Sequence, residues 1–168
     1  MKDLIARSLE GDHNSYIELI KLFQVELYKI AYSQLDNIED INDALQETII
    51  TSYKKLNTLK DMIGFIQKNY NKKITLIDIA SSGNCCKSKC SAIFKELLKQ
   101  SPNQYLIDYR LDRSRNLLLS TDKTILEIAI EVGFNSSSYY CEAFRKKYST
   151  SPTQYRKKLI ETQNINLQ

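Results

Sequence analysis

The sequence predicts an all-α protein, and three observations support this fold class. Apolar residues recur at spacings of three and four over long stretches, which is the pattern of amphipathic helices. Only four glycines and two prolines interrupt the 168 residues. A block of sequence also recurs about 50 positions later, and both copies have helical spacing. These features favour a chain of helices joined by short turns.

Two helices are expected at the start of the chain. Helical spacing of apolar residues predicts the first over residues 16–35, with Asp12 placed to cap its N-terminus. A second is expected over about residues 38–57. Its apolar stripe comprises Ile41, Ala44, Leu45, Ile49, Tyr53 and Leu56. We therefore predict a helical hairpin module over residues 1–60.

An internal repeat is the most informative feature of the chain. The matched segments are 75–80 (TLIDIA) with 124–129 (TILEIA), 94–95 (FK) with 144–145 (FR), and 101–105 (SPNQY) with 151–155 (SPTQY). Both prolines of the protein occupy the same place in this signature. Such agreement at so many spaced positions indicates a duplicated structural unit.

Each copy is predicted to form a helix-turn-helix unit. Thr75 and Thr124 are placed to cap a short helix, whose final alanine lets the next helix pack closely. The following turn needs a residue that reaches positive φ, namely Gly133 in the second copy and Gly83 or Asn84 in the first. A second helix then extends to Phe94 and Lys95 in the first copy and to Phe144 and Arg145 in the second.

A further helix is expected to begin after each unit. Ser101 and Ser151 are placed as N-caps, with proline in the first turn. Residues 102–119, between the copies, are long enough to form one connecting helix at about 1.5 Å per residue. The predicted fold is thus an N-terminal helical hairpin followed by two helix-turn-helix units joined by a long helix.

Both copies carry a series of spaced residues that matches a known family. In the second copy these are segments 128–134 (IAIEVGF), 138–140 (SYY), 144–146 (FRK), 151–152 and 155–156. In the first copy they are segments 74–80, 94–95, 105–106, 110–111 and 117–118. Roughly residues 63–158 therefore resemble the DNA-binding domain of the AraC/XylS family of bacterial transcription regulators. The resemblance implies two units that contact successive major-groove segments of double-stranded DNA about 34 Å apart.

The resemblance also implies which side chains face the bases. These are Lys87, Ser88, Ser91 and Ala92 in the first recognition helix, and Ser137, Ser138, Cys141 and Glu142 in the second. The chain departs from the family at Ala92 and Glu142, where basic residues are common. An arginine would bind guanine bidentately, whereas Glu142 can only accept a hydrogen bond or repel phosphate. We therefore expect base recognition to be weak or to depend on DNA shape.

Basic residues around the recognition helices are expected to contact phosphates. They are Lys87, Lys89, Lys95, Arg145, Lys146, Lys147 and Arg156. The alternative, a solvated helix face, is less favoured because these residues lie within the double motif. Tyr105 and Tyr155 are expected in the core rather than stacked on bases, because they recur at identical helix starts. Arg110 is expected to form an internal salt bridge rather than a base contact.

The N-terminal half resembles a second family. The segments 9–12 (LEGD), 16–35 and 38–48 (IEDINDALQET) are similar to region two of extracytoplasmic-function sigma factors. That resemblance covers roughly residues 5–58 and implies contact with RNA polymerase through Asp43, Gln46 and Glu47. The segment that melts the promoter is missing, since the chain passes directly into 63–70. A hairpin that only packs on the DNA-binding half remains the alternative.

Charge and cysteine content limit the other function classes. Residues 1–62 hold 7 Lys and Arg against 11 Asp and Glu, whereas residues 63–168 hold 17 against 9. An acidic half that meets protein and a basic half that meets a polyanion are thus indicated. There is no run of about 18 apolar residues and no signal peptide, so a cytoplasmic protein without membrane contact is expected. The four cysteines are expected to be reduced thiols.

Rival chemistry finds little support. Acidic residues at helical spacing could hold Mg²⁺ in a nuclease, namely Asp36, Glu39, Asp40, Asp43 and Glu47. No partner cluster accompanies them, and His13 is expected at the surface. Cys85, Cys86 and Cys90 lie close together, but a structural zinc usually needs four ligands, so small buried or groove-facing thiols are favoured over redox sensing. No nucleotide-binding or hydrolase motif occurs, so neither a cofactor, a metal nor an enzyme is expected.

The sequence thus predicts a transcription regulator built from two modules and a tail. The boundaries are 1–60 for the hairpin, 61–160 for the DNA-binding domain and 161–168 for a tail that is frayed from Thr162. We expect an activator that contacts RNA polymerase, with a sigma-like polymerase-binding factor as the alternative and a nucleic-acid enzyme as a third. The sequence is compatible with a monomer on DNA but does not specify the oligomeric state. It also leaves the operator, the sign of regulation and any effector open.

Overall fold

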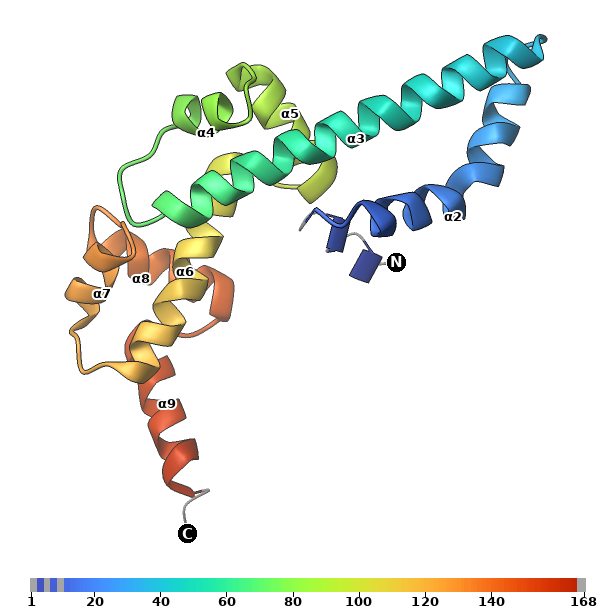
Figure 1. Ribbon diagram of the computed structural model, residues 1–168. Coiled ribbons are helices and arrows are strands. Elements are labelled where there is room, and N and C mark those ends of the chain that lie inside the picture. The colour runs from blue at the N-terminus through green and yellow to red at the C-terminus, as the bar shows by residue number, and fades with distance from the viewer. Residues whose placement is uncertain (1–2, 5–6, 9–10, 166–168) are drawn as a thin grey trace.

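The computed structural model describes the backbone of residues 3, 4, 7, 8 and 11–165, and side chains as far as residue 158. Eight helices follow one another over residues 13–165, and the described residues contain no strand, so the all-α prediction is confirmed (Figure 1). The helices are α2 (His13–Tyr32), α3 (Ile38–Asn69), α4 (Leu76–Ser82), α5 (Lys87–Leu98), α6 (Pro102–Ser120), α7 (Ile125–Glu131), α8 (Ser137–Tyr148) and α9 (Pro152–Ile165).

Helices α2 and α3 form the predicted hairpin, but α3 is longer than expected. The Asp12 side chain caps α2 by accepting from the backbone N–H groups of Asn14 and Ser15, as predicted. The pattern predicts an end of the second helix near Asn57, whereas α3 continues to Asn69. The residues that extend it, Leu59, Met62 and Ile66, are at most 1% exposed. Because these side chains bury against α4 and α5, the helix continues through the boundary predicted at residues 60 and 61.

The two helix-turn-helix units have separate cores that share one helix. The first core packs the end of α3 against α4, α5 and the start of α6, around Phe94. The second packs α6 against α7 and α8, around Tyr140 and Phe144. Helix α6 serves both, since Leu106 belongs to the first core and Leu111 to the second. In Figure 1, α6 connects the unit beside α3 with the unit formed by α7 and α8.

The local signals of the repeat are confirmed. Thr75 and Thr124 each form a capping box, with Asp78 and Glu127 respectively. Gly133 has φ +91°, as predicted. In the first copy the sequence offered Gly83 or Asn84 for positive φ, and it is Asn84 that adopts it, with φ 49°. Gly83 has φ −94° and instead lies tightly against other side chains, where an added Cβ would lie 2.7 Å from the Cγ of Met62. The turn therefore uses an asparagine, which tolerates positive φ better than most residues.

The connecting helix and the last helix also begin as predicted. Ser101 caps α6 through the backbone N–H of Gln104, and the Ser151 hydroxyl accepts from the N–H of Gln154. Helix α6 spans the predicted connection from Pro102 to Ser120. Helix α9 continues to Ile165, so the tail predicted to fray from Thr162 is helical that far, and residues 166–168 lie outside the described part. No described helix is both long and apolar enough to cross a membrane.

Candidate nucleic-acid interface

The exposed faces of α5 and α8 carry the residues predicted to face DNA bases. In α5, Lys87, Ser88 and Ala92 are exposed and Ser91 is half-buried. The opposite face holds the helix in the first core through Cys90, Ile93 and Phe94. Buried anchors on one face therefore present the predicted contact residues together on the other, as a recognition helix requires.

Helix α8 repeats this arrangement. Tyr140 and Phe144 are fully buried, and Ser136 caps the helix by accepting from the N–H of Tyr139. Of the four predicted residues, Ser138 and Glu142 are exposed, whereas Ser137 and Cys141 are half-buried. The two recognition helices are thus positioned by equivalent anchors in the two units. Whether these eight residues contact bases stays a prediction.

A shallow hollow on the surface of α8 is lined by both acidic and basic side chains. It is lined by Ser138, Cys141, Glu142, Arg145 and Lys146. Glu142 lies three and four residues before Arg145 and Lys146, so all three are on one face of the helix. The acidic side chain therefore lies within a basic surface, where it lowers the local positive charge available to phosphate.

The predicted phosphate contacts fall into two groups. Lys89, Lys95, Arg145 and Lys146 are exposed, and in the part of the chain that the structure describes their side chains form no hydrogen bond or ion pair. Lys87, at the N-terminus of α5, is exposed as well. These cations are accessible to solvent and to a polyanion.

Lys147 and Arg156 are instead engaged within the protein. The Lys147 Nζ donates to the Asp108 carbonyl and to Asp112 Oδ2, both at 2.9 Å. Arg156 donates from Nε to the Leu118 carbonyl at 3.1 Å and from Nη2 to the Lys123 carbonyl at 2.7 Å. Phosphate contacts by Lys147 and Arg156 stay predictions. Both side chains also hold neighbouring helices together, which was not expected from the sequence.

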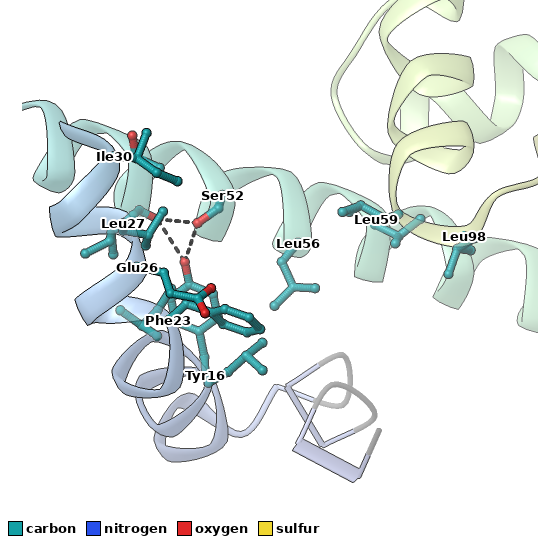
Figure 2. A pocket seen from close by; sticks show the side chains of 14 residues that line it. Tyr16, Phe23, Glu26, Leu27, Ile30, Ser52, Leu56, Leu59 and Leu98 are labelled. Atoms are coloured by element: carbon teal, nitrogen blue, oxygen red, sulfur yellow. Dashed lines mark hydrogen bonds between the residues drawn. The ribbon is translucent and has the colours of Figure 1, made fainter. Parts of the chain in front are cut away.

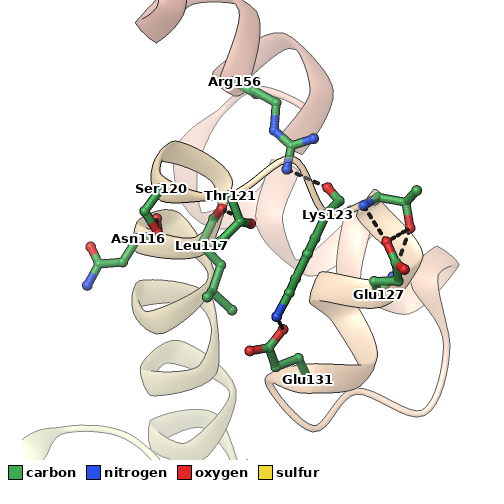
Figure 3. A network of polar contacts seen from close by, with 9 residues as sticks. Asn116, Leu117, Ser120, Thr121, Lys123, Glu127, Glu131 and Arg156 are labelled. Atoms are coloured by element: carbon green, nitrogen blue, oxygen red, sulfur yellow. Dashed lines mark hydrogen bonds and ion pairs between the residues drawn. The ribbon is translucent and has the colours of Figure 1, made fainter.

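The polar network around Arg156 positions helix α7 (Figure 3). Arg156 ties α9 to the loop before α7, and Lys123 in that loop forms a 2.6 Å ion pair with Glu131 at the end of α7. At the start of α7, the backbone N–H and hydroxyl of Thr124 donate to Glu127 and lower the pKa of that carboxyl. Both ends of this short helix are therefore held by polar contacts as well as by its buried face.

Arg110 has an internal role, as expected, but forms no salt bridge among the described residues. Its Nε donates to the Tyr70 carbonyl at 2.7 Å and its Nη2 to the Lys72 carbonyl at 2.8 Å. The guanidinium also lies 5.9 Å from the ring centre of Phe134. Arg110 therefore links the end of α3 to the second unit through carbonyl acceptors, which no charge pattern in the sequence could indicate.

Packing explains why Tyr105 and Tyr155 occupy the same position in the two copies of the repeat. Tyr105 packs against the first core and Tyr155 against the second, as predicted. The Tyr155 hydroxyl also accepts from Arg115 Nε at 2.7 Å, and the Arg115 guanidinium lies over the rings of both Tyr148 and Tyr155. Burial and the hydrogen bond to Asp112 raise the pKa of Tyr148. This cluster fixes α8 and α9 on α6, and the sequence analysis did not detect it.

The cysteines near the first recognition helix differ in exposure. Cys90 is fully buried in the first core, and burial raises the pKa of its thiol to about 11. Cys85 is half-buried and its pKa is also raised by burial, whereas Cys86 is exposed at the N-cap of α5. All four cysteines are free thiols in the structure. Buried thiols, the favoured interpretation, fit Cys90 best.

The residues expected to contact RNA polymerase share one exposed face of α3. Asp43, Gln46 and Glu47 are all exposed, and Ile50, one turn further on, is 51% exposed. Along the same helix, Ile41 is buried and Ala44 and Leu45 are half-buried. The patch is therefore available to a partner, while its likeness to a sigma region stays a prediction.

Comparisons with known proteins agree with this geometry. The model of a family described as a helix-turn-helix domain matches residues 79–158. The uncharacterized HTH-type transcriptional regulator YdeC of Bacillus subtilis is 37% identical over 103 residues, which are 61% of this chain and 35% of that protein. The chain thus spans about a third of that relative's length.

Two solved structures extend the comparison. The C-terminal domain of AraT, a response regulator from Geobacillus stearothermophilus, is 32% identical with a TM-score of 0.57, over 60% of this chain and 84% of that one. A regulator from Chromobacterium violaceum, described by its AraC-type DNA-binding domain, is 26% identical with a TM-score of 0.57, over 59% of this chain and 88% of that one. With two helix-turn-helix units joined by one helix, the chain belongs to the AraC-type family of DNA-binding transcription regulators.

Proposed function

We propose that one chain binds two successive major-groove segments with α5 and α8 and activates transcription from there. The observation that carries this proposal is the equivalent presentation of the two recognition helices, each anchored by buried aromatic residues and exposed on its opposite face. Free basic side chains around them favour a phosphate contact that is sensitive to salt. Glu142 favours weak base recognition by the second helix.

Footprinting of the full chain on DNA fragments selected by the protein tests the DNA part of the proposal. We expect two protected major-groove segments about 10 base pairs apart on one face of the duplex. Ser88→Asp should remove the first segment and Ser138→Asp the second, because each places an anion on the groove-facing side of its helix, where the DNA is negatively charged. Protection of a single segment, lost with only one of the two variants, would refute simultaneous use of both units.

We further propose that the exposed face of α3 contacts RNA polymerase. Asp43, Gln46 and Glu47 lie within one helical turn, so they form one compact acidic and amide patch. They are exposed, so replacing all three by Ala should change folding and DNA affinity little, since surface substitutions usually cost within about 0.5 kcal/mol.

Transcription in vitro from the target promoter decides this point. Activation and binding to the polymerase core should both fall in the triple variant, whereas Asp61→Ala, an exposed acidic change elsewhere on α3, should leave both unchanged. Normal activation by the triple variant would leave the hairpin with a packing role. Polymerase binding that persists without any DNA contact would favour the alternative, a sigma-like factor acting mainly through its hairpin.

A further inference from the structure

The hairpin and the end of α5 form an apolar groove. Figure 2 shows it between α2 and α3, with Phe23 and Ile30 on α2 facing the side of Leu56 on α3. Its volume is about 460 Å³, within the range of about 300–1,000 Å³ that is typical of small-molecule sites. Leu97 and Leu98, at the end of the first recognition helix, also line it. The groove therefore touches both the hairpin and the DNA-binding half.

The size of the groove favours a small molecule over a helix of a partner protein. Two turns of helix, about 10 Å across and 11 Å long, fill roughly 850 Å³, which is nearly twice the volume of the groove. Its lining side chains are nevertheless open to water, since Phe23 is 37% and Ile30 58% exposed. Covering such apolar surface is favourable in proportion to its area. A ligand with a compact apolar body would therefore gain binding energy here.

One carboxylate lies among these apolar side chains. Glu26 is the single charged residue of the 14 that line the groove (Figure 2). Over residues 11–158 its side chain forms no ion pair and no hydrogen bond. The Tyr16 hydroxyl, by contrast, is already bonded to the Ile49 carbonyl at 2.9 Å and to the Ser52 hydroxyl at 2.6 Å. The charged group that the groove offers to a ligand is therefore an anion.

Aromatic rings and the charge of the hairpin favour the same sign of ligand. Phe23 precedes Glu26 by three residues, so the ring and the carboxylate are neighbours on one face of α2, and Tyr16 lines the groove as well. The faces of such rings attract cations, most strongly where water is excluded. Residues 1–62 also hold 11 Asp and Glu against 7 Lys and Arg, so the hairpin half is negative overall. An anionic ligand would be repelled here and drawn to the basic half instead.

We propose that this groove binds an amphiphilic organic cation, whose apolar body packs between α2, α3 and the end of α5 and whose positive charge lies against Glu26. Such a ligand gives the unpaired carboxylate a partner and covers the exposed apolar side chains at the same time. A neutral apolar ligand would do only the second, and an anionic one would oppose the first. The site requires neither DNA nor polymerase, so its test is independent of the function proposed above.

Isothermal titration calorimetry of the full chain with tetraphenylphosphonium and, separately, with tetraphenylborate tests the proposal. The two ions have nearly the same size and shape but opposite charge. A ligand of about 25 non-hydrogen atoms reaches about micromolar affinity at ordinary efficiency, so tetraphenylphosphonium should bind at one site in the micromolar range. Glu26→Gln should weaken this binding at least about fivefold, because it removes the Coulomb attraction. Glu18→Gln makes the same charge change at an exposed position of α2 outside the groove and should have no effect.

A tryptophan at the rim of the groove locates the bound cation. The chain contains no tryptophan, so Ile30→Trp supplies a single fluorescent reporter at a side chain that lines the groove and is 58% exposed. Tetraphenylphosphonium should change the emission of this variant at the concentrations at which it binds, whereas tetraphenylborate, held by the basic half, should not.

Three results would each overturn the proposal. The first is a wild-type chain that binds no tetraphenylphosphonium at up to about 1 mM. The second is an affinity for this cation that Glu26→Gln leaves unchanged. The third is an Ile30→Trp emission that the cation does not change, or that tetraphenylborate changes at the same concentrations, because the bound ion would then lie elsewhere or the groove would not distinguish charge.

Discussion

The contact between Gly133 and the Arg110–Tyr70 pair holds the second helix-turn-helix unit against the end of α3, and Gly133→Ala tests its importance. Gly133 has φ +91°, a conformation that costs a residue with a Cβ about 1–2 kcal/mol. A Cβ there would also lie 2.6 Å from the Tyr70 carbonyl oxygen and 2.9 Å from Arg110 Nη2. The carbonyl belongs to backbone, so the added methyl must push the two units apart or displace Arg110.

The size of the destabilisation by Gly133→Ala depends on the hydrogen bonds of Arg110 that the added methyl would disturb. Hydrogen bonds from charged donors contribute about 1.5–3 kcal/mol, and the bond from Arg110 to Lys72 is exposed and deserves the lower value. Conformational strain and partial loss of these bonds together predict that Gly133→Ala lowers the free energy of unfolding by about 2–4 kcal/mol. Gly64→Ala is the matched control, because a Cβ at this helical position meets nothing within 4 Å. It should stabilise the chain by about 0.5–1 kcal/mol.

Urea unfolding followed by far-UV circular dichroism measures these changes, and a double-mutant cycle assigns their cause. Arg110→Met alone should cost about 2 kcal/mol through its lost carbonyl bonds. Because Gly133→Ala disturbs the same bonds, the double variant should lose about 1 kcal/mol less than the sum of the single losses. A Gly133→Ala protein within about 0.5 kcal/mol of wild type, or strictly additive losses, would refute this account of the contact.

Three further predictions concern the DNA-binding half. Glu142→Arg should tighten binding to most duplexes in gel-shift titrations, and an unchanged affinity would mean that α8 is not at the DNA. Lys146→Ala should lower the slope of log affinity against log salt by about 1, whereas Lys147→Ala, which removes an internally bonded cation, should lower it less. Thr124→Ala should cost about 1 kcal/mol at pH 7. The Thr124 hydroxyl also donates to the Glu127 carboxylate, whose pKa is lowered in the folded chain, so this part of the contribution is present above pH 4.5 and is lost as the pH falls through the lowered pKa. The deficit of Thr124→Ala should therefore become smaller in acid, while the part from the Glu127 N–H bond to the hydroxyl remains.

Local features of the fold were predictable because they depend on residues a few positions apart. Thr75 and Thr124 cap through side chains three residues later, and Gly133 takes the positive φ that its turn requires. The repeat of both prolines located the starts of α6 and α9. The family resemblance implied which faces of α5 and α8 meet DNA, and the structure places the buried anchors Phe94 and Phe144 on the opposite faces.

The roles of individual charges were decided only by tertiary structure. Arg110, Lys147 and Arg156 bind backbone carbonyls 33 to 40 residues away, and a carbonyl acceptor leaves no mark on the sequence. Two predicted phosphate contacts thus have internal partners, while Lys89 and Lys95 remain exposed.

By itself the sequence determined the family, the all-α class, the duplicated unit and the caps that start most helices, because these depend on short-range spacing and on a repeated signature. Tertiary structure decided where α3 ends, since Leu59, Met62 and Ile66 continue the helix only by burying against α4 and α5. It also decided that α2 stays largely uncovered, because burial depends on whether another surface of matching shape lies opposite, and nothing within one helix can specify that.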